Sequence, residues 1–181
     1  MKNKAFFLDR DGIINERLIG EYVKSINEFV FIEDFFNLLI KIKENNYLAI
    51  LISNQQGVGK EIMTKDDLDN IHVYMQDVLF SKTKYYLDDI FICTSLASEN
   101  DYRRKPNPGM ILEAIEKYDI DPNQSFMVGD SLSDIEAGNK ANVKTIFIGN
   151  DINLNANFNF VNIMEFVKHF EDVLQLTQNE I

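Results

Sequence analysis

Three short apolar segments of this chain each stop abruptly at polar residues, and this recurrence constrains the fold more than any other feature. Residues 5–8 run into Asp9, residues 48–52 into Ser53, and residues 126–128 into Gly129 and Asp130. Apolar runs of this length between helical segments are typical of buried parallel strands. Ligands of such sheets bind outside the carboxyl ends of the strands. We therefore expect the polar residues after the three strands, together with Asp11, to converge on one crevice.

The rest of the chain alternates between helical and strand patterns. Helices are expected over residues 34–46, from residue 64, and over residues 108–118 and 133–141, with further strands over 90–93 and 145–148 and a short strand and final helix within 158–176. This alternation predicts an α/β fold, a Rossmann-like three-layer sandwich with a central parallel sheet. No internal repeat or linker interrupts the pattern, so residues 1–181 are expected to form a single domain. Residues 10–31 are expected to be mostly irregular, and a loop of that length is uncommon unless it is functional.

Charge and composition exclude several classes of protein. The formal net charge of −11 gives a surface that repels nucleic acid and anionic membranes at long range. No stretch approaches the roughly 20 apolar residues that a membrane span needs, and Asp9 interrupts the first apolar run too early for a signal peptide. Cys93 is the single cysteine, so no internal disulfide can form. We expect a cytoplasmic, monomeric protein with no nucleic-acid or membrane partner.

The expected crevice concentrates negative charge. Four carboxylates would crowd one edge of the sheet, those of Asp9, Asp11, Asp130 and Asp134. Two unit charges about 4 Å apart repel by about 4 kcal/mol at an effective dielectric near 20. Such a cluster needs a cation or shared protons, and oxygen ligands without a histidine or cysteine cluster suit a hard ion, Mg²⁺.

Anion-binding groups are expected beside these carboxylates. They are the cationic side chains of Arg104 and Lys105, the Ser53 hydroxyl and nearby backbone N–H groups. A hard cation combined with anion donors indicates a phosphate ester as the small-molecule substrate.

The motifs that carry this chemistry resemble those of one family. Residues 7–15 (FLDRDGIIN) resemble the first motif of the haloacid-dehalogenase (HAD) phosphatases, Ser53 the second, Lys105 the third and residues 129–134 (GDSLSD) the fourth. Residues 54–59 (NQQGVG) and 104–110 (RKPNPGM) also resemble the D-glycero-D-manno-heptose 1,7-bisphosphate phosphatase branch. The resemblance covers about residues 5 to 150 and implies an HAD-like fold and a Mg²⁺-dependent phosphatase acting on a sugar phosphate.

The resemblance implies a role for each matched residue. Asp9 would be the nucleophile that forms an aspartyl-phosphate, and Asp11 the general acid and base. Asp9, the backbone carbonyl of Asp11, and Asp130 would bind Mg²⁺, with Asp134 supporting the metal from behind or through water. The transferring phosphoryl group would be bound by Ser53 and Lys105 with help from Arg104, and Asn54 and Gln55 would contact the substrate.

The chain departs from the heptose branch at one place. That branch carries a zinc site of three cysteines and one histidine before its third motif. Here only Cys93 matches, and Ser95, Asp101 and Arg103 stand in the other places. One thiol does not make a structural zinc site, so we predict that no zinc is bound and that residues 94–103 are ordered by other means or mobile. Residues 10–31 and 54–64 are too short for a cap domain.

Other functions share parts of this pattern. Histidinol-phosphate phosphatases share the motif set, and a polynucleotide 3′-phosphatase is a third possibility that the negative charge opposes. A catalytically idle binding protein would not need all four motifs. Residues 57–61 only partly match a nucleotide-binding P-loop, because Asn54 replaces the required glycine and Glu61 the Ser or Thr.

Overall fold

A single parallel sheet organises the chain. The computed structural model describes residues 2–152 and 155–178. Within them the strands pair side by side in the order β3-β2-β1-β4-β5-β6, and every neighbouring pair is parallel. The strands are β1 (Ala5–Leu8), β2 (Leu48–Asn54), β3 (Asp89–Cys93), β4 (Phe126–Gly129), β5 (Lys144–Ile148) and β6 (Phe158–Phe160).

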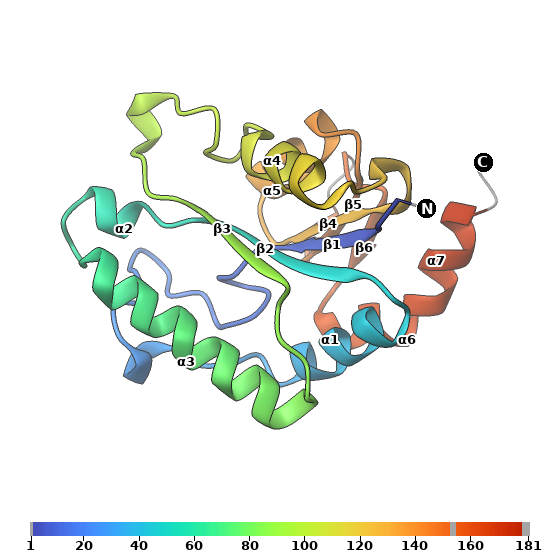
Figure 1. The fold of residues 1–181 in the computed structure, drawn as a ribbon, viewed down its shortest axis with the longest axis horizontal. Coiled ribbons are helices and arrows are strands. Elements are labelled where there is room, and N and C mark those ends of the chain that lie inside the picture. The colour runs from blue at the N-terminus through green and yellow to red at the C-terminus, as the bar shows by residue number, and fades with distance from the viewer. Residues whose placement is uncertain (1, 153–154, 179–181) are drawn as a thin grey trace.

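Helices cover both faces of this sheet and make three layers (Figure 1). One face packs against α1 (Asp34–Glu44), α3 (Lys65–Thr83), α6 (Ile163–Lys168) and α7 (Phe170–Gln178). The other packs against α4 (Gly109–Tyr118) and α5 (Leu132–Lys140). The α/β three-layer sandwich with a central parallel sheet is therefore confirmed.

Burial on both faces explains why the central strands β1 and β4 carry no polar residue. Phe6 and Leu8 of β1 point into the larger core with α1 and α3, whereas Phe7 points into the smaller core with α4 and α5. Successive side chains of a strand alternate between faces, so a strand covered on both sides carries no polar position until it ends. This is why the first polar residue after each strand marks the edge of the sheet.

The predicted elements are found with shifts of one or two residues at their ends. Thr64 caps α3 in a reciprocal arrangement with Asp67, as its sequence suggested. Two details were wrong. The segment after β2 is not only a loop, because α2 (Gln56–Gly59) forms one helical turn there, and the tail holds two helices, α6 and α7, instead of one.

Residues 10–31 remain mostly irregular, as expected. Their only helical element is one 3-10 turn, η1 (Ile26–Glu28), so no cap domain is built there. In the part of the chain that the structure describes, no helix combines the length and the apolar character needed to cross a membrane.

Candidate active site

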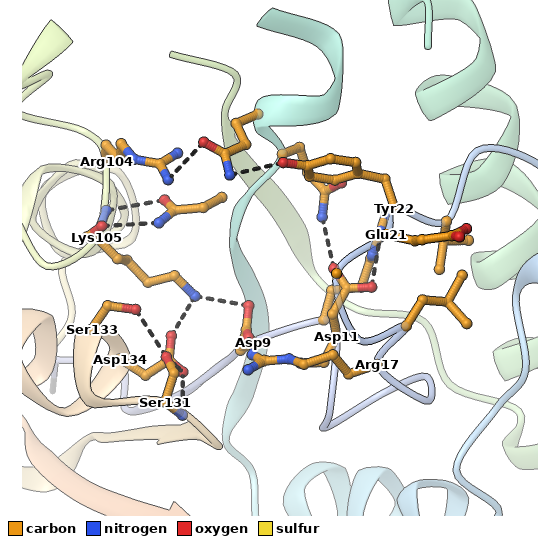
Figure 2. A pocket seen from close by; sticks show the side chains of 17 residues that line it. Asp9, Asp11, Arg17, Glu21, Tyr22, Arg104, Lys105, Ser131, Ser133 and Asp134 are labelled. Atoms are coloured by element: carbon orange, nitrogen blue, oxygen red, sulfur yellow. Dashed lines mark hydrogen bonds and ion pairs between the residues drawn. The ribbon is translucent and has the colours of Figure 1, made fainter. Parts of the chain in front are cut away.

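A cavity of about 430 Å³ opens at the carboxyl ends of the central strands (Figure 2). Most of the residues singled out in the sequence line it: Asp9, Asp11, Asn54, Gln55, Arg104, Lys105 and Asp134. They come from β2 and from the segments after β1, after β4 and before α4. The expected convergence is therefore present, although Asp9 and Asp134 lie far apart in the sequence.

Asp9, Asp134 and Lys105 line the cavity and contact one another, and Asp130 lies beside them without lining it. These four residues are called here the acidic floor. Carboxylate oxygens of the three aspartates all lie within 4.8 Å of one another. The Lys105 Nζ lies 2.8 Å from Asp9 Oδ1 and 2.6 Å from Asp134 Oδ1, and it donates to the backbone carbonyl of Ile52 at 2.7 Å. Two hydrogen bonds and an ion pair with Asp134 hold this nearly fully buried ammonium.

Crowding and burial change the proton affinities of the acidic floor. Burial, followed by repulsion from Asp134, raises the pKa of Asp9 to about 6. Burial and the charge of Asp9 raise the pKa of Asp130 to about 7. For Lys105, burial alone would lower the pKa, but the negative charges of Asp134 and Asp9 outweigh burial and raise it. The ammonium therefore stays protonated, and the excess negative charge of the carboxylates requires a further cation or protons.

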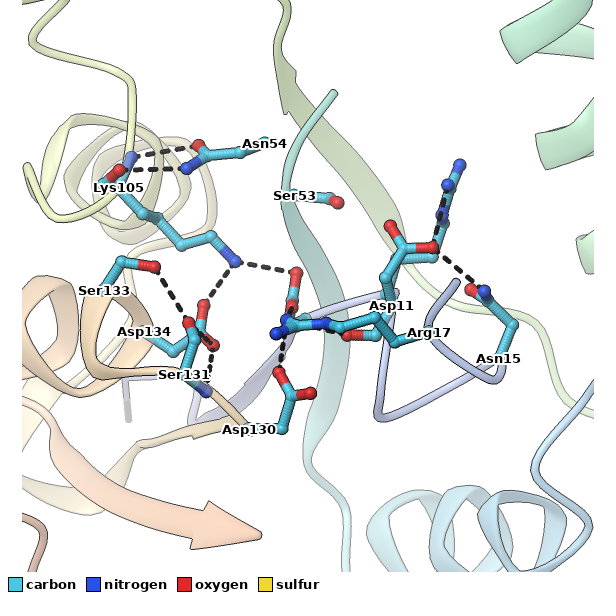
Figure 3. A network of polar contacts seen from close by, with 12 residues as sticks. Asp11, Asn15, Arg17, Ser53, Asn54, Lys105, Asp130, Ser131, Ser133 and Asp134 are labelled. Atoms are coloured by element: carbon cyan, nitrogen blue, oxygen red, sulfur yellow. Dashed lines mark hydrogen bonds and ion pairs between the residues drawn. The ribbon is translucent and has the colours of Figure 1, made fainter. Parts of the chain in front are cut away.

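A second positive group already lies against the carboxylates (Figure 3). The Arg17 Nη2 is 2.6 Å from Asp130 Oδ1, 3.2 Å from the backbone carbonyl oxygen of Asp11 and 3.8 Å from Asp9 Oδ2. These three oxygens are those that the sequence assigned to a metal ion. The Arg17 guanidinium occupies the place of a cation among these three oxygens. Because every atom that could bind a metal here is a hard oxygen, the residues present fit a divalent cation such as Mg²⁺.

Gly12 allows the acidic floor to close. Its φ is +98°, a conformation that L side chains rarely adopt, and a Cβ built there would lie 2.0 Å from Asp130 Oδ2. Only glycine at position 12 lets the turn after β1 approach the carboxylate of Asp130, which directly follows β4. This requirement gives a physical reason for the glycine in the first motif.

Asp11 stands apart from the acidic floor and has its own donors. Its Oδ1 accepts hydrogen bonds from Arg10 Nη2 at 3.1 Å and Asn15 Nδ2 at 2.9 Å, and its Oδ2 accepts one from Gln55 Nε2 at 3.1 Å. Burial would raise the pKa of Asp11, but the charge of Arg10 and these hydrogen bonds outweigh it and lower the pKa. The pKa values of Asp9 and Asp11, two aspartates of one motif, are thus shifted in opposite directions.

The residues at the end of β2 make contacts within the protein. Gln55 Nε2 donates at 2.9 Å to the hydroxyl of Ser53, which is almost fully buried. Asn54 uses its side-chain amide on the backbone of Lys105, accepting from its N–H at 3.0 Å and donating to its carbonyl at 2.9 Å. Asn54 and Gln55 line the cavity, but their hydrogen bonds hold other site residues in place, and their contact with substrate stays a prediction.

Residues 94–108, called here the rim loop, connect β3 to α4 and carry Arg104. The Arg104 guanidinium donates to Gln56 Oε1 at 3.2 Å, and Gln56 Nε2 donates to the Tyr22 hydroxyl at 2.9 Å. Figure 2 shows the two ends of this chain of hydrogen bonds, Arg104 and Tyr22, above Asp9 in the view. The rim loop therefore presents a positive, hydrogen-bonding edge opposite the carboxylates.

The sequence assigned no role to Arg17, Asn15, Gln56 or Tyr22, although Asn15 and Gln56 stand within the matched motifs. All four contribute contacts in or beside the cavity. The only signal that pointed toward Arg17 and Tyr22 was the unusual length of the irregular segment after β1, since such loops are usually functional.

Comparisons with known proteins agree with the geometry. A family model described as HAD-hydrolase-like matches residues 102–166. A D-glycero-beta-D-manno-heptose-1,7-bisphosphate 7-phosphatase of Helicobacter pylori (strain 26695) is 42% identical over 142 residues, covering 78% of this chain and 81% of the relative. The D-glycero-alpha-D-manno-heptose-1,7-bisphosphate 7-phosphatase of Campylobacter jejuni is 34% identical over 174 residues, covering 95% and 98%.

A solved structure shares the fold. The D,D-heptose 1,7-bisphosphate phosphatase from B. bronchiseptica, complexed with magnesium and phosphate, superposes with a TM-score of 0.84 at 23% identity. The match covers 94% of this chain and 99% of that one.

Proposed function

Because this chain belongs to the HAD-like hydrolases, among the heptose-1,7-bisphosphate 7-phosphatases, we propose that it hydrolyses the 7-phosphate of a D-glycero-D-manno-heptose 1,7-bisphosphate. The observation that carries the proposal is the acidic floor, where Asp9 faces both a buried lysine and a position for a divalent cation. This combination suits an anionic phosphoryl group approaching a carboxylate nucleophile. The proposal treats residues 1–181 as one phosphatase domain that acts as a cytoplasmic monomer.

We assign Mg²⁺ to the position where the Arg17 guanidinium lies. Asp9, the backbone carbonyl of Asp11, and Asp130 would hold the ion, and Asp134 would support it. Bound Mg²⁺ would neutralise charge on the phosphoryl oxygens and favour attack at phosphorus. Asp134 already connects Lys105 to the N-terminus of α5, since its Oδ2 accepts from the Ser131 backbone N–H at 3.1 Å.

Asp9 acts as the nucleophile in this proposal. One of its carboxylate oxygens forms a bond to phosphorus while the bond from phosphorus to the sugar oxygen breaks, leaving an aspartyl-phosphate. Lys105 pairs with Asp9 Oδ1 at 2.8 Å and is close enough to share its charge with the transferring oxygens. Water then attacks the phosphorus of the intermediate, which releases inorganic phosphate and restores Asp9.

Asp11 transfers the protons. It gives one to the departing sugar oxygen in the first step and takes one from the attacking water in the second. In the free protein, hydrogen-bond donors keep the Asp11 carboxylate ionised. The proton that Asp11 gives away in the first step must therefore arrive with the substrate. The negative charge of an incoming phosphate favours that proton, because like charges raise the pKa of a carboxylate.

The substrate extends from the acidic floor toward the rim loop. Ser53 would bind a phosphoryl oxygen. The resemblance assigned Arg104 to the same phosphoryl group, but its guanidinium is bonded to Ser95 and Gln56, so we place it against the remaining part of a phosphorylated sugar instead. Asn54 and Gln55 would contact it at the end of β2. An open cavity without a cap domain leaves room for a sugar that bears two phosphates.

A phosphate-release assay tests the proposal. The purified protein is given the α and β anomers of the heptose 1,7-bisphosphate, fructose 1,6-bisphosphate and histidinol phosphate, each with Mg²⁺ and with a chelator. We expect the highest kcat/KM for one heptose anomer, loss of activity with chelator, and release of the 7-phosphate. Preference for histidinol phosphate would replace the proposed substrate, and no Mg²⁺-dependent release from any ester would overturn the enzyme assignment.

A further inference from the structure

Asp101 lies at the centre of the rim loop and gathers several donors. Its Oδ2 accepts hydrogen bonds from the Ser95 hydroxyl and, at 3.6 Å, from the Cys93 thiol, and its Oδ1 accepts from the Arg103 backbone N–H at 2.8 Å. These donors come from the end of β3 and from the far side of the loop. One carboxylate therefore closes the loop onto the strand from which it departs.

The backbone of Asp101 continues the same connection. Its carbonyl oxygen accepts from Asn107 Nδ2 at 2.9 Å and from the Arg104 backbone N–H at 3.1 Å. The Arg104 side chain is held by the other half of the network, because its Nη1 donates to the Ser95 carbonyl at 2.9 Å. Asp101 thus holds the backbone of Arg104, and Ser95, whose hydroxyl binds Asp101, holds its guanidinium.

The charge of Asp101 suits this arrangement. Hydrogen bonds from Ser95 and from the Arg103 backbone hold the pKa of Asp101 below its ordinary range. Hydrogen bonds to an ionised acceptor are stronger than those between neutral groups. Residues 94–103 were expected to bind no zinc and to be either ordered by other means or mobile, and the contacts of this carboxylate offer such a means.

We propose that Asp101 is a positioning residue, whose carboxylate orders the rim loop and thereby aims Arg104 at the part of the substrate that is not cleaved. The role of Arg104 in this proposal rests on the proposed function. Asp101 itself touches no reacting atom, since its side-chain partners all lie within the loop and at the end of β3. Its loss should therefore weaken substrate binding more than turnover.

Kinetics of two variants test the positioning role. Asp101→Ala removes both acceptors, whereas Asp101→Asn keeps one oxygen and places an amide that can donate to Ser95. We expect Asp101→Ala to raise KM for the heptose bisphosphate about tenfold with kcat little changed. Asp101→Asn should lie between it and the parent. A small ester such as p-nitrophenyl phosphate, which does not reach Arg104, should show no change in KM.

Asp121 supplies a matched control. It also accepts hydrogen bonds in a turn, from the Asn123 backbone at 3.0 Å and from Gln124 Nε2 at 3.1 Å, but it lies outside the cavity. Asp121→Ala should leave KM for both esters unchanged. An unchanged KM for the bisphosphate in Asp101→Ala, or equal losses of kcat on both esters, would overturn the positioning role.

The single cysteine gives a readout that does not depend on activity. Cys93 is buried and its thiol is bound to Asp101. If Asp101 orders the loop, a thiol reagent should modify Cys93 about tenfold faster in folded Asp101→Ala than in the parent or in Asp121→Ala. Unchanged labelling overturns the proposal even if the enzyme assays fail. Faster labelling in a protein without heptose phosphatase activity would instead count against the proposed function alone and support the loop's dependence on Asp101.

Discussion

The acidic floor and the rim loop border one cavity, but different interactions hold their side chains in place. The side chains of Lys105, Asp9 and Asp134 in the acidic floor are at most 8% exposed. Asp9 follows β1 and Asp134 lies in the first turn of α5, whereas Lys105 reaches the acidic floor from the rim loop, where Asn54 holds its backbone. The rim loop has no strand, and Tyr102 within it is 60% exposed. Burial makes charge interactions strong in the acidic floor, whereas the rim loop depends on many modest hydrogen bonds. Substitutions in the acidic floor should therefore change chemistry, and substitutions near the rim should change binding.

The largest effect is expected at the nucleophile. Asp9→Asn keeps the shape of the side chain but removes its nucleophilic charge, so kcat for the preferred phosphate ester should fall by at least about 10⁴-fold. Asp66→Asn, on the exposed side of α3, is the control and should match the parent. Activity close to that of the parent in Asp9→Asn would remove the acidic floor from the mechanism.

Asp11 should show the next largest effect. Asp11→Asn cannot carry a proton between sugar and water, and kcat should fall by roughly 10²–10⁴-fold. Mass spectrometry of the protein after mixing with substrate should detect a phosphoryl group retained on Asp9, because hydrolysis of the intermediate also loses its base. A loss of less than threefold would show that Asp11 transfers no proton.

Metal binding should depend on pH through the acidic floor. The pKa values of about 6 for Asp9 and about 7 for Asp130 mean that both carboxylates must release protons before they bind a cation. Mg²⁺ affinity should therefore fall by at least about tenfold as the pH drops from 7.5 to 5.5, and it should change little above 7.5. Calorimetry in buffers of different ionisation enthalpy would measure the released protons. Affinity that does not vary over this range would show that neither carboxylate binds the metal.

The same shifts affect the stability of the metal-free protein. Both pKa values lie above that of an unfolded aspartate, so the folded state holds more protons between pH 4 and 7. Its stability should decrease as the pH rises through this window, and added Mg²⁺ should restore it. Thermal unfolding with and without Mg²⁺ at pH 5 and pH 8 would check the sign.

Arg17 comes from the irregular segment after β1, outside the rim loop, and its guanidinium lies against the acidic floor. Arg17→Gln removes a cation that Mg²⁺ must displace, so the Kd for Mg²⁺ should fall by about three- to tenfold. Lys60→Gln removes an equal charge that bonds to Tyr22 instead of the carboxylates, and it should leave the Kd unchanged. An unchanged or raised Kd in Arg17→Gln would show that Arg17 does not compete with the metal.

The smallest effect is expected near the rim. Gln56→Ala breaks the link between Arg104 and Tyr22 but leaves Arg104 bound to Ser95. KM for the bisphosphate should rise by about two- to fivefold with kcat unchanged. A larger loss of kcat than of binding would contradict the division between the two regions.

The sequence was sufficient for the acidic floor because its geometry follows from strand ends. Asp9 and Asp130 come directly after strands that are buried on both faces, and adjacent parallel strands end at the same edge of a sheet. Lys105 was recognised through the resemblance to a family motif, since no periodic pattern leads from α4 or β3 to the nucleophile.

The contacts near the rim could not be foreseen in the same way. Arg17 and Tyr22 lie in a segment without periodicity, where the backbone path depends on tertiary contacts. Asp101 offered no signal beyond a departure from the family pattern. Its partners, Cys93, Ser95 and Arg103, are determined by how the loop folds back on β3.

The side chain of Asn54 bonds to the backbone of Lys105 much as a neighbouring strand of the sheet would. A carboxamide carries an NH₂ donor group and a carbonyl acceptor in one plane, so it can offer the backbone of Lys105 the same donor and acceptor as an adjoining peptide. The two hydrogen bonds hold the backbone of Lys105 in place, so the length of its side chain determines where its ammonium lies. An aspartate at position 54 would turn a carboxylate oxygen toward the carbonyl of Lys105, and a leucine would form neither hydrogen bond. Position 54 is therefore defined by hydrogen-bonding polarity and not by size or charge.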